Sequence, residues 1–165
     1  MKIKRLFLTV LFLTVASSIG FAQSKTKAIT PDVIVKNLYA AQKNPQNSPF
    51  FQTKKRALVD KYFTKALANL LWKDVIDADG VGNLDFDPLY NAQDTRITAF
   101  QIGKPDYGEG NLKVADVPVK FKNMGKAETI LFRLEQNAAK IWKISDIYYP
   151  SNSKSSASLK AVLSR

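Results

Sequence analysis

The first half of the chain carries apolar residues at the spacing of amphipathic helices. Thr30 and Pro31 have the residue types favoured at the N-cap and first position of a helix, and Pro45 disfavours helical geometry in the residue before it. Spacing and end signals together predict three helices, over residues 31–44, 54–63 and 64–77, with Thr64 as the N-cap of the third.

After residue 94 the pattern changes to the alternation of apolar and polar residues that is typical of β-strands. Turn-forming residues separate four such segments, which lie over residues 95–102, 111–121, 126–136 and 139–149. Because the turns between them are short, we expect consecutive strands to pair antiparallel. The order of elements predicts an α+β domain, with N-terminal helices packed on the concave face of a curved four-stranded antiparallel sheet.

The second predicted strand changes its alternation part-way along. Leu112 and Val114 occupy even positions, whereas Val117 and Val119 occupy odd ones. Because side chains alternate with a period of two, a regular strand cannot place both pairs on one face. We therefore expect a β-bulge near Asp116, and a sheet that is curved by it.

Composition narrows the chemistry that the chain can perform. The 165 residues are 45% hydrophobic and 24% charged, which is typical of a globular protein and unlike disordered, collagen or coiled-coil chains. Cysteine and histidine are both absent, which excludes disulfides, thiolate nucleophiles, Cys/His zinc sites and an imidazole base. The length fits one domain, placed at residues 23–149, before a Ser-rich flexible C-terminal tail, 150–165, in which residues 158–163 have a short helical pattern.

Residues 1–22 have the pattern of a secretory signal peptide. Three basic residues precede the apolar run 6–16, and the small residues Gly20 and Ala22 stand at the −3 and −1 positions of a cleavage site before Gln23. The alternative is an uncleaved membrane anchor, but the run is short for a span. Because the chain also lacks cysteine, we expect a periplasmic or secreted bacterial protein, cleaved between Ala22 and Gln23.

Several segments of the sequence resemble a known family. The matching residues are Tyr62–Thr64 leading into Leu67–Leu71, then Leu84–Pro88, Ala92–Asp94 and Trp142–Ile147. With the predicted order of elements, residues 30–149 are similar to the secreted bacterial domain of unknown function 3828, within the nuclear-transport-factor-2-like, or cystatin-like cone, superfamily. The resemblance implies a cone-shaped fold and export, without an established activity. The wider superfamily uses its cone pocket for isomerases, dehydratases, ligand binding and dimerisation, so fold does not decide function.

Charge is distributed unevenly along the chain. Three of the 25 basic residues precede Gln23, which leaves 22 basic against 14 acidic residues in the mature chain, a net charge of +8. Residues 74–94, which we call the acidic stretch, contain six aspartates and no lysine or arginine, so they carry −6 and the rest of the mature chain +14. Three interpretations compete: aspartates that cap turns, a cation site, and the rim of a ligand pocket.

The cation interpretation is weakened by the ligands that are missing. Asp77, Asp79 and Asp85 have spacings found in a calcium-binding loop. Val81 and Pro88, however, stand where that loop needs an oxygen ligand and a bidentate glutamate. We therefore expect no metal site and no cofactor.

The acidic stretch is expected to form an ordered wall of the domain. In an extended chain the ring of Phe86 points away from the carboxylates of Asp85 and Asp87. We expect Phe86 to be buried against the third helix or the sheet. We also expect Asp87 or Asp94 to accept hydrogen bonds from backbone amides or from a basic side chain such as Arg96.

Without histidine or cysteine, a catalytic site would depend on carboxylates, tyrosine and lysine. Asp94 as a base, with Tyr39 or Tyr62 as hydrogen-bond donor, would follow the chemistry of ketosteroid isomerase. Both tyrosines also fit the buried faces of amphipathic helices, which is the commoner role. We therefore assign no catalytic residue. The candidate ligand-binding residues are Tyr39, Tyr62, Asp85, Asp87, Gln93 and Asp94.

The sequence favours a non-catalytic role. We predict a module of the bacterial cell envelope that binds a small ligand or a protein partner, and the alternative is a small lyase, isomerase or hydrolase that uses Asp and Tyr. The basic charge favours peripheral attraction to anionic envelope polymers, and export argues against nucleic acid as a partner. A monomer and a homodimer both fit the sequence.

Overall fold

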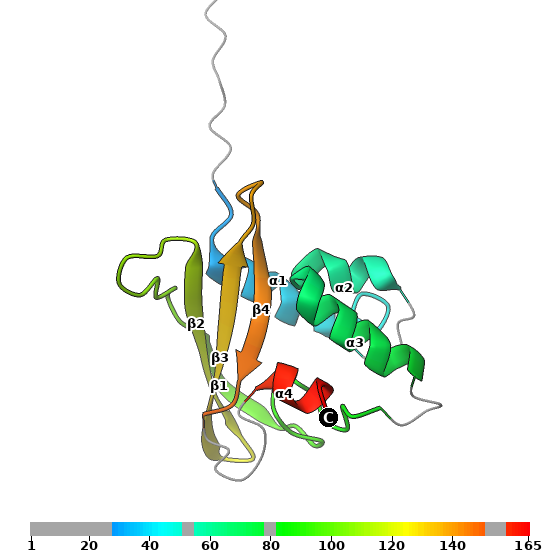
Figure 1. Cartoon of the computed structure of the whole chain (residues 1–165). Helices are drawn as coiled ribbons and strands as arrows, with labels where there is room; N and C mark the ends of the chain where they lie inside the picture. Colours follow the sequence, from blue (N-terminus) through cyan, green and yellow to red (C-terminus); the bar gives the residue numbers. More distant parts are fainter. Residues whose placement is uncertain (1–27, 51–54, 78–81, 151–157) are drawn as a thin grey trace, which may run out of the picture.

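The predicted order of three helices followed by four strands is confirmed. The computed structural model describes residues 28–50, 55–77, 82–150 and 158–165 (Figure 1). Its elements are α1 (Pro31–Gln42), α2 (Arg56–Tyr62), α3 (Lys65–Asp77), β1 (Ile97–Ile102), β2 (Val114–Asn123), β3 (Lys126–Gln136), β4 (Trp142–Tyr148) and α4 (Leu159–Leu163). The chain therefore has an α+β fold, with helices and a four-stranded antiparallel sheet.

The predicted signal peptide, residues 1–22, lies outside the described residues. Within the described ranges, none of the helices combines the length and the apolar character that a membrane span requires. Both the signal peptide and its cleavage before Gln23 stay predictions.

The strands form one sheet in the order β1-β2-β3-β4, and each neighbouring pair is antiparallel. α1 crosses one face of this sheet, whereas α2 and α3 lie beyond its β4 side (Figure 1). The two outer edges of the sheet differ. The N–H of Thr64, between α2 and α3, donates to the carbonyl of Ile144 in β4 (2.9 Å), whereas in the described residues no strand pairs with the outer edge of β1.

The prediction of a β-bulge in β2 is wrong, because the pairing of β2 with β3 contains none. Their ladder runs without a break from Val114, opposite Glu135, to Asn123, opposite Lys126. The odd-numbered residues from 115 to 121 are buried, the even-numbered ones are less so, and Leu112, before the strand, is 76% exposed. The apolar residues at even positions therefore need no place in the core.

Pro118 is accommodated in β2 because β1 ends opposite it. In an antiparallel pair, the N–H and C=O of one residue point to the same neighbouring strand. The carbonyl of Pro118 accepts from the N–H of Gly103 (2.7 Å), one residue beyond the end of β1. The missing N–H of Pro118 therefore faces a place where the ladder has stopped. A side chain at position 103 would collide with the ring of Pro118, which explains the glycine there.

Register shifts occur in other strands instead. In β1, the register with β2 shifts between Thr98 and Gln101, where Ala99 has a positive φ of 50°. Between β3 and β4, the register shifts at Arg133 and Leu134. The sheet is thus irregular at two positions, and neither lies in the segment where the alternation argument predicted a bulge.

The core lies between the sheet and the helices. Its members with no exposed surface include Val35, Leu38, Leu67, Ala68, Leu89, Val117, Val119, Phe132, Leu134, Ile144, Ile147 and Leu159. Leu89 belongs to the acidic stretch, which therefore contributes to the core, as an ordered wall would.

The predicted flexible tail is wrong for residues 158–165. Leu159 has 0% of its surface exposed, and α4 packs against α3 and β4 (Figure 1). The Ser158 hydroxyl accepts from the N–H of Ala161 (3.3 Å), and the Asp146 carboxylate accepts from the N–H of Lys160 (3.1 Å). These bonds satisfy two backbone N–H groups in the first turn of α4. The C-terminal residues are therefore ordered, although their serine-rich composition predicted a flexible tail.

Candidate functional site

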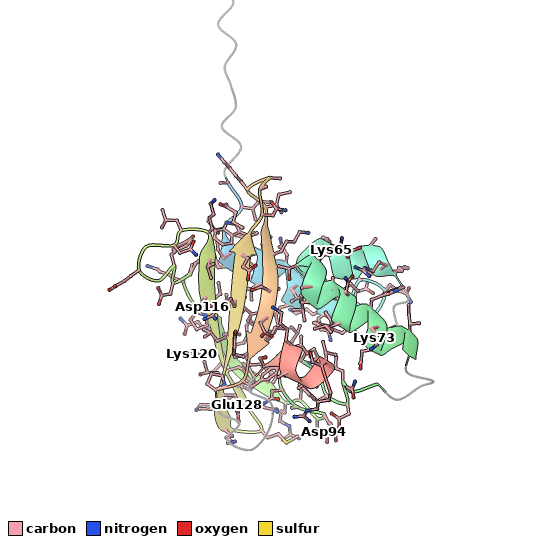
Figure 2. The ribbon with its side chains drawn as sticks, viewed as in Figure 1. Lys65, Lys73, Asp94, Asp116, Lys120 and Glu128 are labelled. Atoms are coloured by element: carbon pink, nitrogen blue, oxygen red, sulfur yellow. The ribbon has the colours of Figure 1, made fainter. Side chains whose placement is uncertain are left out.

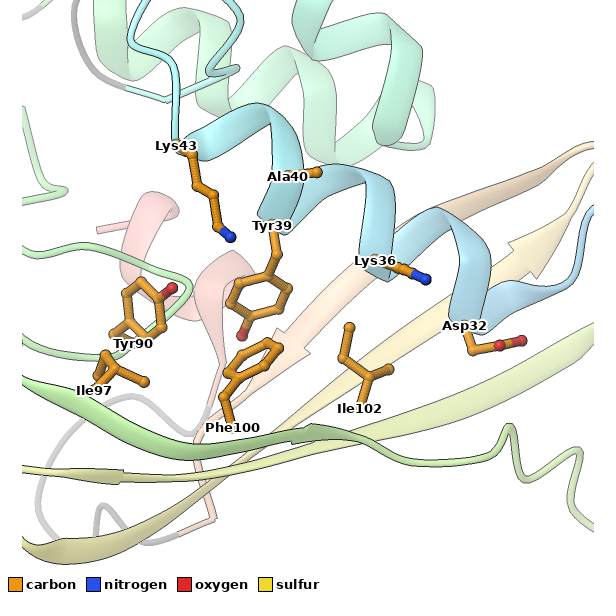
Figure 3. Close-up of a pocket in the computed structure, with 9 residues that line it drawn as sticks. All are labelled: Asp32, Lys36, Tyr39, Ala40, Lys43, Tyr90, Ile97, Phe100 and Ile102. Carbon is orange, nitrogen blue, oxygen red and sulfur yellow. The ribbon is translucent and has the colours of Figure 1, made fainter.

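A groove of about 700 Å³ lies between α1 and β1 (Figure 3). Small-molecule sites in proteins have volumes of roughly 300–1,000 Å³, so the groove is large enough for such a ligand. Its lining consists of Asp32, Lys36, Tyr39, Ala40, Lys43, Tyr90, Ile97, Phe100 and Ile102. We call this space the α1–β1 groove.

The helix side supplies the charged rim of the groove. Its five lining positions follow the helical repeat, with steps of three or four residues apart from the adjacent pair Tyr39 and Ala40, so they share one face of α1 and its C-terminal end. Tyr39 points from this face into the groove, and Lys43 is directed toward the side where Tyr90 lies (Figure 3). Lys36 and Asp32 lie together at the other end. One acidic and two basic side chains therefore border the groove.

The strand side supplies the apolar floor, and the bulge in β1 makes this possible. In a regular strand, Ile97 would face away from Phe100 and Ile102, because odd and even positions lie on opposite faces. The extra residue at Ala99 shifts the alternation by one, and all three side chains then line the groove (Figure 3). A left-handed alanine is strained by about 1 kcal/mol, and such strain tends to be concentrated at functional sites.

Aromatic rings pack edge-to-face within the groove. The Tyr39 ring centroid lies 4.8 Å from that of Phe100 at an angle of 67°, and 5.6 Å from that of Tyr90 at 63°. Phe100 nonetheless keeps 42% of its surface exposed. The floor therefore offers an aromatic surface to an apolar ligand.

The two tyrosines of the groove are neutral at neutral pH. Burial raises the pKa of Tyr39 well above its usual value, and burial together with the nearby Asp87 carboxylate raises the pKa of Tyr90. The Tyr39 hydroxyl donates to the carbonyl of Leu89 (2.7 Å). Its proton is therefore engaged in holding the acidic stretch against α1.

The lysines of the groove have no ion-pair partner in the part of the chain that the structure describes. The ion pairs found there are Arg56–Asp60, Lys126–Glu128 and Arg133–Asp116, which involve none of the groove residues. Lys36 and Lys43 are both exposed. Their charges are therefore hydrated and accessible to an anion.

The structure does not bring the predicted site residues together. Among them, Tyr39 lines the groove, whereas the Tyr62 hydroxyl donates to the carbonyl of Asn37 (3.4 Å). The three exposed members are Asp85, Gln93 and Asp94. Asp94 lies at the molecular surface (Figure 2), so it does not form the buried pair with a tyrosine that the isomerase hypothesis required.

Asp87 connects the acidic stretch to α1. One carboxylate oxygen accepts from the N–H of Leu89 (2.8 Å), and the other accepts from the side-chain amide of Gln42 (3.3 Å). Gln42 in turn accepts from the hydroxyl of Ser48. Burial raises the pKa of Asp87, and the two hydrogen bonds that it accepts partly oppose this rise. The expected bond between Asp87 and a backbone amide is confirmed.

The turn-capping interpretation of the acidic stretch is supported at a second aspartate. The Asp74 carboxylate accepts from the N–H groups of Asn83 (2.7 Å) and Leu84 (3.3 Å). Phe86 is half-buried, with its ring 5.8 Å from that of Tyr149, so the expected full burial is wrong although it does pack beside the end of β4. The stretch is therefore held by hydrogen bonds to backbone and side-chain groups and by the ring contacts of Phe86 and Tyr90.

Residues 78–81, at the centre of the calcium-loop spacing considered for the acidic stretch, lie outside the described residues. Within the described ranges, no three acidic side chains come together as metal ligands. That the acidic stretch binds no metal stays a prediction.

Sequence reasoning missed most of the groove. Lys36, Tyr39 and Lys43 follow the spacing i, i+3, i+7, which places them on one helical face, and this signal was present in the sequence. The opposing floor had no local signal, because it depends on β1 packing beside a helix far away in the chain.

No family model, curated protein or solved structure matches the chain. The resemblance to the nuclear-transport-factor-2-like superfamily therefore stays a prediction. The case for a function depends on the α1–β1 groove itself.

Proposed function

We propose that the protein is a non-catalytic binding module of the bacterial cell envelope, and that its α1–β1 groove takes a small ligand with an apolar body. The observation that carries the proposal is the floor of the groove, where Phe100 keeps 42% of its surface exposed beside the rings of Tyr39 and Tyr90. Exposed apolar surface inside a concave site is typical of ligand-binding grooves. The signal-peptide pattern of residues 1–22 supports the envelope location.

The polar groups near the groove favour binding over catalysis. A general base must come within hydrogen-bond reach of its substrate. Asp32 is the one carboxylate among the groove residues, and it lies at the end away from Tyr90 (Figure 3). The Tyr39 hydroxyl donates to a backbone carbonyl, so it is not a ready proton donor.

The test uses N-phenyl-1-naphthylamine, a neutral aromatic probe whose fluorescence rises in apolar surroundings. The mature protein should bind it saturably with one site, and Phe100→Ala should weaken binding about fivefold, because one aromatic contact of about 1 kcal/mol is lost. Leu112→Ala is the matched control, since Leu112 is 76% exposed and lies outside the groove. Absence of saturable binding, or equal loss in both variants, would contradict the proposal.

A further inference from the structure

We propose that the α1–β1 groove selects a small organic anion, whose aromatic or cyclic body lies on Phe100 and whose single anionic group is bound by Lys43. The inference rests on the proposed function, because it names the class of ligand that the same groove takes.

The charges around the groove favour an anion. Lys36 and Lys43 outnumber the single acidic lining residue, Asp32. Lys36 and Asp32 lie toward one end of the groove, whereas Lys43 is directed toward Tyr90 at the other end (Figure 3). Lys43 therefore supplies the ammonium group at the Tyr90 end, where the Asp87 carboxylate also acts on Tyr90.

The acidic group behind that end is already engaged. Asp87 influences Tyr90 electrostatically, but its two carboxylate oxygens accept from the N–H of Leu89 and from the amide of Gln42. Lys43 makes no ion pair with it or with any other acidic residue that the structure describes. The Lys43 ammonium thus keeps its capacity to donate to a ligand.

The aromatic floor indicates the shape of the anion's organic body. The rings of Tyr39, Tyr90 and Phe100 pack at 63° and 67°, and Phe100 offers exposed ring surface beside them. A flat aromatic or cyclic body matches this surface, and ring–ring contact adds to simple burial of area. With a single lysine at this end, one anionic group is matched, and a polyanion is not.

Lys43 also has an explanation that needs no ligand. It is the C-cap residue of α1, and a cation there offsets the partial negative charge of the helix C-terminus. A purely structural Lys43 would therefore lower stability when replaced, without changing which probe the groove prefers. The experiment must separate preference from stability.

The experiment titrates the mature, isotope-labelled protein with three probes that share one ring system: 2-naphthoate, 2-naphthamide and 2-naphthylmethylammonium. Affinities are measured from NMR shift changes at low salt. The dissociation constant of 2-naphthoate should be about threefold or more below that of the amide, as an exposed ion pair allows, and that of the cation should be the highest. Added salt should raise the dissociation constant of 2-naphthoate and leave that of the amide unchanged.

Three variants locate the selection. Lys43→Gln should bring the affinity for 2-naphthoate down to that for the amide, whereas Lys65→Gln, an exposed position on α3 (Figure 2), should leave the preference intact. Phe100→Ala should weaken all three probes alike. Equal binding of 2-naphthoate and 2-naphthamide by the unaltered protein, or a preference that survives Lys43→Gln, would overturn the inference and leave the proposed function standing. Binding of none of the probes would overturn both.

Discussion

Among single residues, Ala99 has a left-handed backbone conformation, which is sterically unfavourable for a residue that carries a Cβ atom. Ala99→Gly removes the steric strain of about 1 kcal/mol, while the freer unfolded chain takes back a similar amount. We expect the free energy of unfolding in urea to stay the same or rise by up to about 1 kcal/mol. Ala127→Gly, at an exposed position of β3 without a positive φ, should instead lower it by about 0.5–1 kcal/mol. Equal losses in both variants would mean that Ala99 is not strained.

Asp87 makes stability depend on pH in a direction that can be stated. Burial raises its pKa above the usual 3.8, so the folded protein holds this proton to a higher pH than the unfolded chain does. The contribution of Asp87 to the free energy of unfolding is therefore highest below about pH 3.8. It falls as the pH rises through the raised pKa of Asp87, and it stays constant above that pKa.

Asp87→Asn tests this dependence, because an amide cannot ionise. We expect the stability of the variant, relative to the unaltered protein, to improve as the pH rises across that window in a series of urea titrations. Asp94→Asn, at an exposed position, is the control and should change stability by less than about 0.5 kcal/mol at each pH. A difference between Asp87→Asn and the unaltered protein that is constant with pH would contradict the assignment.

Among the elements, α4 shows that a short helix can be part of the core. Leu159 has no exposed surface, so Leu159→Ala should lower the free energy of unfolding by about 2–4 kcal/mol through loss of burial and the cavity left behind. Leu112→Ala removes the same atoms from a side chain that is 76% exposed, and should cost less than about 0.5 kcal/mol. Similar values for both would mean that α4 is not anchored in solution.

The elements that could be predicted are those with strong local signals. Thr30 and Pro31 marked the start of α1, and Pro45 set the limit of its end. The alternation argument failed in β2 because it assumed that Leu112 must be buried. Applied to residues 97–102, the same argument locates the true bulge, because an odd-numbered isoleucine is followed by apolar residues at positions 100 and 102.

The groove was less predictable than the elements that form it. The sequence places Lys36, Tyr39 and Lys43 on one face of a helix, but it does not show what packs opposite them. The predicted acidic residues were chosen for their charge, and the structure uses Asp74 and Asp87 to accept hydrogen bonds from backbone amides. A cluster of like charges in sequence is therefore poor evidence for a cluster in space.

For the molecule as a whole, export is the prediction that decides where its ligand must be found. The mature chain should begin at Gln23, because Gly20 and Ala22 fit the cleavage signal. Intact-mass and N-terminal analysis of protein expressed in a bacterium with its own export machinery would check this. A chain that retains residues 1–22 would contradict cleavage and indicate a tethered protein.

At high protein concentration, the shape of β1 has a second effect. A straight open edge strand is a template on which other chains add by β-pairing and aggregate. β1 ends the sheet, and the turn of the backbone at Ala99 interrupts its row of N–H and C=O groups. Deleting Ala99 would straighten this edge and turn Ile97 out of the groove, so the variant should scatter light at lower concentrations and lose affinity for the neutral probe. Resistance to aggregation and the capacity to hold a ligand would then depend on the same additional residue.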